Sequence, residues 1–162
     1  MSRVFLGLGA NLGDRLANLT AAQAALSPAV RVLRASRVYE SEPVGLREQH
    51  LFLNQVVAGE TALRPGALLV YLKDIERRMG RLPGPRYGPR PIDLDLLFFD
   101  DWVFGSGELV IPHPRFRERS FVLAPLAEIA PDLRDPVTGE TIAAIWRRTA
   151  PFLAPCWVYE GG

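Results

Sequence analysis

Two aspartates stand two positions apart in an apolar segment near the middle of the chain. Asp93 and Asp95 belong to IDLDLLFF, residues 92–99, which reads as a buried strand. Side chains two apart on a strand leave the same face, so both carboxylates would lie close together in apolar surroundings, where like charges repel. Such a pair suits Mg²⁺, which takes one or two carboxylates together with phosphate oxygens and water. The alternative is an exposed strand face whose aspartates pair with arginine.

Arginines precede the aspartate pair in a loop rich in glycine and proline, GRLPGPRYGPRP at 80–91. The loop carries Arg81, Arg86 and Arg90. Surface ion pairs with the aspartates would add little stability. Fixed charges of both signs are typical of a polyphosphate site, in which carboxylates hold the metals and guanidinium groups take the remaining phosphate oxygens. The sequence has no Walker A motif, so phosphoryl chemistry here would rely on arginines and metals.

A second cluster of charge lies in IPHPRFRERSF at 111–121. His113 stands between two prolines, which hold the backbone extended, and Arg115, Arg117 and Arg119 follow it. A lone histidine is often structural. With three arginines alongside, a phosphate- or ribose-binding role for His113 is an equal alternative.

Two phenylalanines and an asparagine suggest a place for a flat heterocycle. Phe52 begins a segment with strand character, and Phe121 follows the arginine cluster. Both could be core residues, or both could line a cleft and hold a ring by offset stacking. Asn54, two positions after Phe52, would share its face, and its amide can both donate and accept hydrogen bonds.

Glycines near the N-terminus imitate a dinucleotide-binding fingerprint. Gly7, Gly9 and Gly13 give G-x-G-x-x-x-G, which is one residue too long. We therefore expect only a tight strand-to-helix turn here, with Asn11 tolerating unusual backbone dihedral angles.

Hydrophobic periodicity predicts the elements that must position these residues. Strands are expected at 4–8, 31–39, 52–60, 92–99 and 109–111, and helices at 14–27, 65–80, 115–117, 122–129 and 141–148. Two adjacent strands between two helices favour a ferredoxin-like α+β sandwich, with helices on one face of an antiparallel sheet and a mainly helical C-terminal extension. We expect one domain over residues 1–162.

Composition narrows the classes of function. A formal net charge of +1 argues against a general nucleic-acid binder, and 48% hydrophobic residues suffice for a substantial core. The single cysteine, Cys156, forms no internal disulfide and is interpreted as structural. No apolar run reaches transmembrane length, so a cytoplasmic protein without membrane contact is expected.

Six segments in order resemble the 6-hydroxymethyl-7,8-dihydropterin pyrophosphokinase family. They are GANLGD at 9–14, YESEPVG at 39–45, FLNQVV at 52–57, DIERRMGR at 74–81, GPRPIDLDLLFF at 88–99 and IPHPRFRERSFVLAPLAEIAP at 111–131. The resemblance implies an enzyme of folate biosynthesis that transfers pyrophosphate from ATP to the hydroxymethyl group of 6-hydroxymethyl-7,8-dihydropterin. AMP and the pterin diphosphate are the implied products.

The same resemblance assigns roles to residues of this sequence. It implies binding of ATP, the pterin and two Mg²⁺ ions per site. Separately, we expect a monomer that binds no nucleic acid. The metal ligands would be Asp93 and Asp95, which with Arg81 and Arg90 form the catalytic set. The residues implied in ATP binding are Glu76, Arg86, His113 and Arg119. Those implied in pterin binding are Ser41, Val44, Phe52, Asn54 and Phe121.

Two other functions use some of the same residues. A two-metal nuclease or phosphohydrolase could employ the two aspartates, but it leaves the phenylalanines and Asn54 without a role. A non-catalytic nucleotide- or RNA-binding module would carry aromatic platforms on its central strands and more positive charge. Asp93 and Asp95 would repel nucleic acid in the absence of metals.

Overall fold

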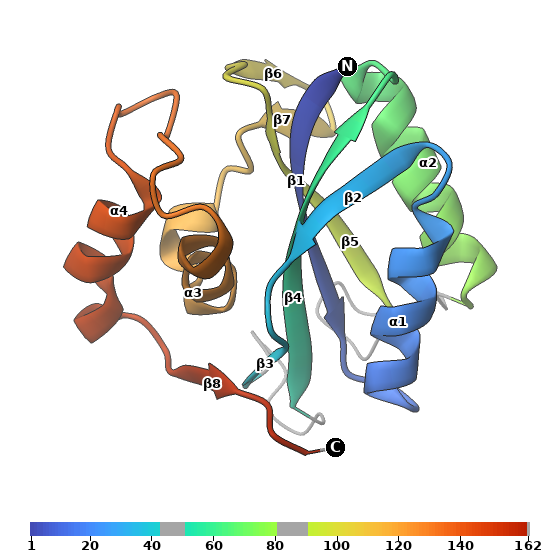
Figure 1. The fold of residues 1–162 in the computed structure, drawn as a ribbon, viewed down its shortest axis with the longest axis horizontal. Helices are drawn as coiled ribbons and strands as arrows, with labels where there is room; N and C mark the ends of the chain where they lie inside the picture. The colour runs from blue at the N-terminus through green and yellow to red at the C-terminus, as the bar shows by residue number, and fades with distance from the viewer. Residues whose placement is uncertain (43–50, 81–90, 162) are drawn as a thin grey trace.

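The computed structural model describes residues 1–42, 51–80 and 91–161 (Figure 1). Its strands are β1 (Ser2–Ala10), β2 (Val30–Ala35), β3 (Tyr39–Ser41), β4 (Phe52–Thr61), β5 (Asp93–Phe99), β6 (Phe104–Ser106), β7 (Leu109–Ile111) and β8 (Cys156–Val158). The α-helices are α1 (Arg15–Ala25), α2 (Pro65–Arg78), α3 (Ser120–Ile129) and α4 (Ile142–Thr149), with 3₁₀ helices η1 (Phe116–Glu118) and η2 (Ala150–Phe152).

Six strands form one antiparallel sheet. Its order is β5-β1-β4-β3-β8, and β2 pairs with the other end of β4. Strand β4 thus lies between β1 and the β2–β3 segment, although helix α1 connects β1 to β2 in the chain. The expected α+β class with an antiparallel sheet and helices is confirmed, and this strand order agrees with a ferredoxin-like arrangement.

Helices cover both faces of the sheet, not one. Helices α1 and α2 lie on one side and α3 and α4 on the other (Figure 1). The first core lies under α1 and α2 and includes Val4, Leu6, Leu8, Leu19, Leu68, Leu72 and Leu94. The second lies under α3 and α4 and includes Phe5, Val56, Leu97, Phe98, Phe116 and Leu123. The prediction was incomplete because the apolar residues of the C-terminal helices do not reveal which face they cover.

The turn between β1 and α1 differs in detail from the expectation. Gly13 adopts the left-handed region with φ +70°, whereas Asn11 is fully buried and keeps a negative φ. The Asp14 side chain accepts a hydrogen bond from the Ala17 N–H at 3.1 Å and so caps α1. Glycine, not Asn11, therefore supplies the unusual conformation of this turn.

The strand expected at 31–39 is divided into two. Strand β2 ends at Ala35, and β3 begins at Tyr39. The Ser36 Oγ accepts a hydrogen bond from the Val56 N–H at 3.0 Å, so a side chain takes over the pairing where the strand is interrupted. At the C-terminus, β8 pairs with β3, so a mainly helical extension is not clearly confirmed.

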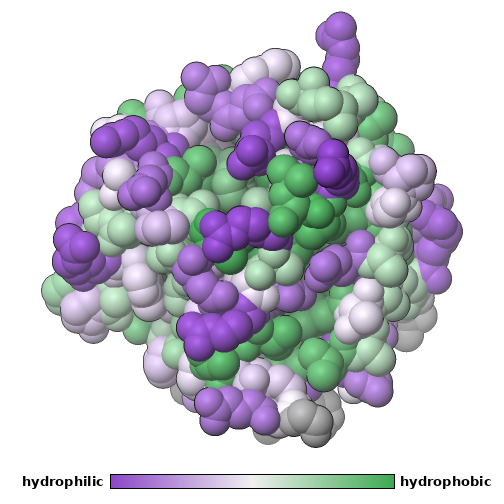
Figure 2. All heavy atoms as spheres, in the orientation of Figure 1, coloured by the Kyte–Doolittle hydropathy of each residue, from purple (hydrophilic) through white to green (hydrophobic). Residues whose placement is uncertain are grey.

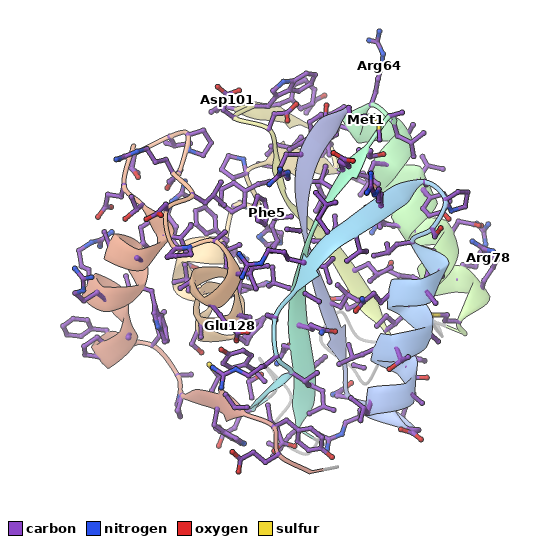
Figure 3. All side chains as sticks on the ribbon, viewed as in Figure 1. Met1, Phe5, Arg64, Arg78, Asp101 and Glu128 are labelled. Atoms are coloured by element: carbon purple, nitrogen blue, oxygen red, sulfur yellow. The ribbon has the colours of Figure 1, made fainter. Side chains whose placement is uncertain are left out.

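Helix α3 is tied to the start of β3 through Glu128. Its carboxylate accepts hydrogen bonds from the Tyr39 hydroxyl at 2.6 Å and from the Arg37 N–H at 3.0 Å (Figure 3). Phe5 lies on the same side of the sheet and packs edge-on against Phe98, with their ring centroids 6.1 Å apart. The Glu128 hydrogen bonds join α3 to the sheet, and the Phe5–Phe98 contact belongs to the core beneath this helix.

The surface shown in Figure 2 mixes charged and apolar residues over the region of α1 and β2. Leu16 and Leu33 from these elements are among the exposed large apolar side chains. Within the described ranges, no helix has the length and apolarity needed to cross a membrane.

Candidate active site

The two aspartates lie at the start of β5 on the sheet face that α3 covers. Asp93 pairs with Gly9 and Asp95 with Gly7 of the neighbouring strand β1. Leu94, between the aspartates, is buried in the core on the opposite face. The predicted same-face placement of the two carboxylates is therefore confirmed.

The protonation of Asp95 reflects its surroundings. Burial raises its pKa to about 7, and the neighbouring charge of Asp93 acts in the same direction. About 33% of the Asp95 side chain remains accessible, so the carboxyl group can still meet a ligand. A cation at this position would lower the pKa values of both carboxylates and favour their charged forms, as a bound metal ion does to its carboxylate ligands.

Glu76 supports the aspartates from behind the sheet. This residue of α2 is 2% exposed, and its carboxylate accepts a hydrogen bond from the Leu94 N–H at 2.7 Å. The bond fixes the backbone midway between Asp93 and Asp95. An ATP contact by Glu76 stays a prediction, whereas the contact in this structure is with β5.

Arg119 connects the aspartates to the start of α3. Its Nη1 lies 3.9 Å from the Asp95 Oδ2, and its Cζ lies 5.6 Å from the centre of the Phe121 ring. About 19% of the side chain is accessible. Arg119 therefore places one guanidinium near both the Asp95 carboxylate and the Phe121 ring.

His113 lies beside the same group of charges. The backbone N–H of His113 donates to the Leu97 carbonyl oxygen at 2.9 Å, and the imidazole Nδ1 accepts from the backbone N–H of Arg115 at 3.1 Å. Burial lowers the pKa of His113 to about 4, and the positive charge of Arg119 adds to this effect. The imidazole is therefore neutral near pH 7, with its proton on Nε2.

Arg117 is separate from the site, although the sequence grouped it with Arg115 and Arg119. Its guanidinium donates two hydrogen bonds to the fully buried Asp135, at 2.6 and 2.9 Å. The group also lies over the Phe116 ring, 4.4 Å from its centre. Arg117 was counted among the arginines beside His113, but in the structure its guanidinium pairs with Asp135, because nearby positions in an irregular segment point in different directions.

Ser41, Phe52 and Asn54 gather on the other side of β1. The Asn54 Nδ2 donates to the Ser41 Oγ at 2.8 Å, and both residues are buried. Asn54 pairs with Gly9, which also pairs with Asp93 on the far side. The amide and the aspartates thus share one sheet face and are separated by the width of β1.

Phe121 belongs to the first turn of α3, and Phe52 begins β4. Both rings are partly accessible, and Phe121 packs against the second core. The predicted residues Val44, Arg81, Arg86 and Arg90 lie outside the described part of the chain. The described site thus combines the carboxylates of β5, the Arg119 guanidinium before α3, the Asn54 amide of β4 and the two phenylalanine rings.

The candidate metal ligands are the two aspartates, Asp93 and Asp95. Within residues 1–42, 51–80 and 91–161, no group of three or more His, Cys, Asp or Glu side chains could hold a metal ion. Two carboxylates remain compatible with Mg²⁺, because this ion commonly takes one or two protein carboxylates and completes its shell with phosphate oxygens and water.

Comparison with known proteins connects this geometry to a family. The protein-family model described as 7,8-dihydro-6-hydroxymethylpterin-pyrophosphokinase (HPPK) matches residues 5–131 of this chain. The chain is 45% identical over 144 residues to the 2-amino-4-hydroxy-6-hydroxymethyldihydropteridine pyrophosphokinase of Methylorubrum extorquens, covering 88% of this chain and 90% of that protein. It is 46% identical to a mitochondrial folate synthesis bifunctional protein of Arabidopsis thaliana, covering 86% of this chain.

Solved structures agree in fold. A crystal structure of wild-type Plasmodium falciparum HPPK-DHPS with pteroate covers 93% of this chain with a TM-score of 0.75 and 16% identity. The chain spans 25% of the length of the Arabidopsis relative and 42% of the Plasmodium chain. The matched region is thus one part of these longer proteins, whereas it makes up most of the bacterial relative.

Proposed function

Because this chain belongs to the 7,8-dihydro-6-hydroxymethylpterin-pyrophosphokinase family, we propose that it transfers pyrophosphate from ATP to 6-hydroxymethyl-7,8-dihydropterin. The hydroxymethyl oxygen forms a bond to the β-phosphorus of ATP as the bond from that phosphorus to the AMP oxygen breaks. The hydroxyl group loses its proton in the process. The products are AMP and the pterin diphosphate, and the reaction belongs to folate biosynthesis.

The observation that carries this proposal is the shared face of β1, β4 and β5. Asp93 and Asp95 stand on one side of β1, and the Asn54–Ser41 pair stands on the other. A substrate with a polar flat ring and a short hydroxymethyl arm can contact the amide with its ring and reach the carboxylates with its arm. A nuclease or phosphohydrolase would give the buried Asn54–Ser41 pair no ligand to bind.

On the phosphate side, Asp93 and Asp95 would hold two Mg²⁺ ions. The raised pKa of Asp95 supports this assignment, because burial, with the added charge of Asp93, disfavours the ionised carboxylate until a cation is bound. When bound, the ions neutralise phosphate charge and orient the phosphate oxygens. Asp93 and Asp95 contribute by fixing where those charges sit, since Glu76 holds the backbone between them.

Arg119 and His113 would hold the phosphates of ATP near the aspartates. Arg119 offers a planar guanidinium, and neutral His113 offers its Nε2 proton without adding another positive charge. Arg81, Arg86 and Arg90 would complete the phosphate contacts, with Arg81 and Arg90 on the transferring group. Positioning and charge stabilisation supply most of phosphoryl-transfer catalysis.

On the pterin side, Phe52 and Phe121 would enclose the ring. The Asn54 amide would read its polar edge, with its orientation fixed by Ser41. Backbone groups around Val44 would contribute further contacts. We also propose that residues 1–162 act as a single catalytic domain, including the helices after β7 as its C-terminal extension, and that the protein is a cytoplasmic monomer.

The test is to identify the nucleotide product. The protein is mixed with ATP, Mg²⁺ and 6-hydroxymethyl-7,8-dihydropterin, and the nucleotides are separated by chromatography. AMP formed one-for-one with a pterin diphosphate is the expected result. ADP would indicate an ordinary kinase and overturn attack at the β-phosphorus, and pterin-independent release of phosphate would favour a phosphohydrolase.

A further inference from the structure

The central strand β1 is accessible at only two positions between Val4 and Ala10. Strands β4 and β5 pair with it on both sides, and the side chains around the two positions are buried in the two cores. The accessible residues are Gly7 and Gly9, which lie on the same face. The missing side chains leave the β1 backbone itself open on the face that carries the candidate site.

Gly9 forms the floor between the two halves of the site. It pairs with Asn54 of β4 and with Asp93 of β5, so each neighbour stands directly beside it. A Cβ atom at Gly9 would lie 3.4 Å from the Asn54 Oδ1 and 3.6 Å from the Phe52 Cδ1. A methyl group there would occupy space that these two pterin-side groups face.

The protein itself does not require glycine at this position. The backbone at Gly9 lies outside the left-handed region, and the Cβ contacts above are tight but do not overlap. Gly59 of β4 is different, since a Cβ there would lie 2.8 Å from the Arg31 carbonyl oxygen. Glycine within a strand is less stable than alanine, and it often marks a place where a ligand approaches the backbone closely.

We infer that Gly9 is a specificity-determining residue whose missing side chain lets the dihydropterin ring lie directly against the β1 backbone between Asn54 and Asp93. This inference rests on the proposed function and adds a binding surface that the sequence motifs did not indicate. With the ring at this depth, its edge meets the Asn54 amide and its hydroxymethyl arm extends toward the carboxylates. An alanine methyl group lifts the ring away from both.

The first test compares Gly9→Ala with Gly66→Ala. Gly66 lies in α2, and a Cβ there would have no neighbour within 4 Å, so its alanine variant controls for glycine replacement alone. Both variants should keep or slightly raise the melting temperature. Gly9→Ala should weaken dihydropterin binding at least about tenfold, whereas ATP binding and the Gly66→Ala kinetics should stay within twofold of wild type.

The second test uses the unaltered protein, so it does not depend on the folding of a variant. The chain is labelled with ¹⁵N-glycine and titrated with 6-hydroxymethylpterin, and backbone amide signals are followed by NMR. A heterocycle lying on β1 should shift the Gly9 signal strongly and leave the Gly66 signal in place.

The possible failures are distinguishable. Wild-type protein that neither binds the pterin nor forms AMP would overturn the proposed function, and this inference with it. If wild type is active, the inference alone is overturned by normal pterin binding in a folded Gly9→Ala protein. Saturating pterin that leaves the Gly9 signal unmoved would also overturn it alone.

Discussion

The buried carboxylate of Glu76 accepts a hydrogen bond from the Leu94 N–H at 2.7 Å, midway between the two aspartates of the candidate site. The two residues belong to different layers, α2 and the sheet. The bond replaces a strand-to-strand contact at the edge strand β5, which pairs only with β1 among the described strands. A residue on the far face of the sheet thus fixes the backbone from which Asp93 and Asp95 project.

Glu76→Ala should lower both stability and turnover. Removing the acceptor leaves a buried N–H group without this bond, which costs about 1–3 kcal/mol. Glu76→Gln keeps an acceptor oxygen and should recover most of the lost stability. Urea denaturation measures the first effect and AMP formation the second; equal stability of wild type and Glu76→Ala would show that the bond contributes little.

Asp95→Asn should abolish pyrophosphate transfer while the protein remains folded. The amide keeps the size of the side chain but cannot supply a negative charge to a cation. Product formation and the far-UV circular dichroism spectrum are measured on the same sample. Near-normal transfer by this variant would remove Asp95 from the metal-ligand set.

The same substitution should change how stability depends on pH in metal-free protein. The pKa of Asp95 is about 7 in the folded chain and about 3.8 ordinarily, so the folded state keeps a proton that the unfolded state has lost. This stabilisation is fully present below pH 3.8 and is lost as the pH rises through 7. Asp95→Asn should therefore lose less stability than wild type between pH 5 and 8 in EDTA, as measured by urea denaturation.

His113 should affect the pH dependence of stability in the direction opposite to Asp95. Its pKa is about 4 in the folded protein and about 6.5 ordinarily, so the unfolded chain takes up a proton first as the pH falls. The neutral, buried imidazole contributes stability that is present above pH 6.5 and lost as the pH falls through 4. His113→Gln should lose less stability than wild type between pH 7 and 4.5. An identical pH profile for the two proteins would contradict the buried neutral state.

The most predictable part of the site was the sheet face on which each strand residue lies, because this follows from strand periodicity. The alternation in IDLDLLFF placed Asp93 and Asp95 on one face, and the spacing of Phe52 and Asn54 placed them on another strand with a shared direction. These inferences needed only the period of two. The meeting of the two pairs across Gly9 depends on the register of three strands, which local patterns do not encode.

Long-range partners could not be predicted in the same way. The hydrogen bond between Glu76 and Leu94 joins a helix to a strand. The sequence around Glu76 does not indicate that its carboxylate accepts a hydrogen bond from a strand. Arg117 and Arg119 stand two positions apart in an irregular segment, where no periodicity assigns one to Asp135 and the other to Asp95. Strand β8 is only three residues long and was not expected, because its pairing with β3 is what makes it a strand.

Ser41→Ala should weaken pterin binding with little effect on ATP. The Ser41 Oγ accepts a hydrogen bond from the Asn54 Nδ2 at 2.8 Å, which leaves the amide oxygen facing Gly9. Without this partner the buried amide can rotate, and its donor and acceptor no longer present one fixed pattern. We expect the pterin KM to rise severalfold with kcat changed less. Unaltered kinetics would show that Asn54 is oriented by other contacts.

Arg119→Ala and Arg117→Ala should separate catalysis from stability. Arg119 lies beside Asp95, with 19% of its side chain accessible, so its loss should reduce turnover strongly and leave the melting temperature nearly unchanged. Arg117 is the partner of the fully buried Asp135, and its loss leaves a buried charge unpaired at a cost of about 3–5 kcal/mol.

The two arginines serve as matched controls because they lie in one segment and lose the same atoms on substitution. Steady-state kinetics should show a large fall in kcat only for Arg119→Ala, and thermal denaturation should show a large shift only for Arg117→Ala. Lysine at position 119 should restore little activity, since it lacks the planar fork that fits phosphate oxygens. Full activity in the lysine variant would mean that Arg119 acts only as a point charge near Asp95.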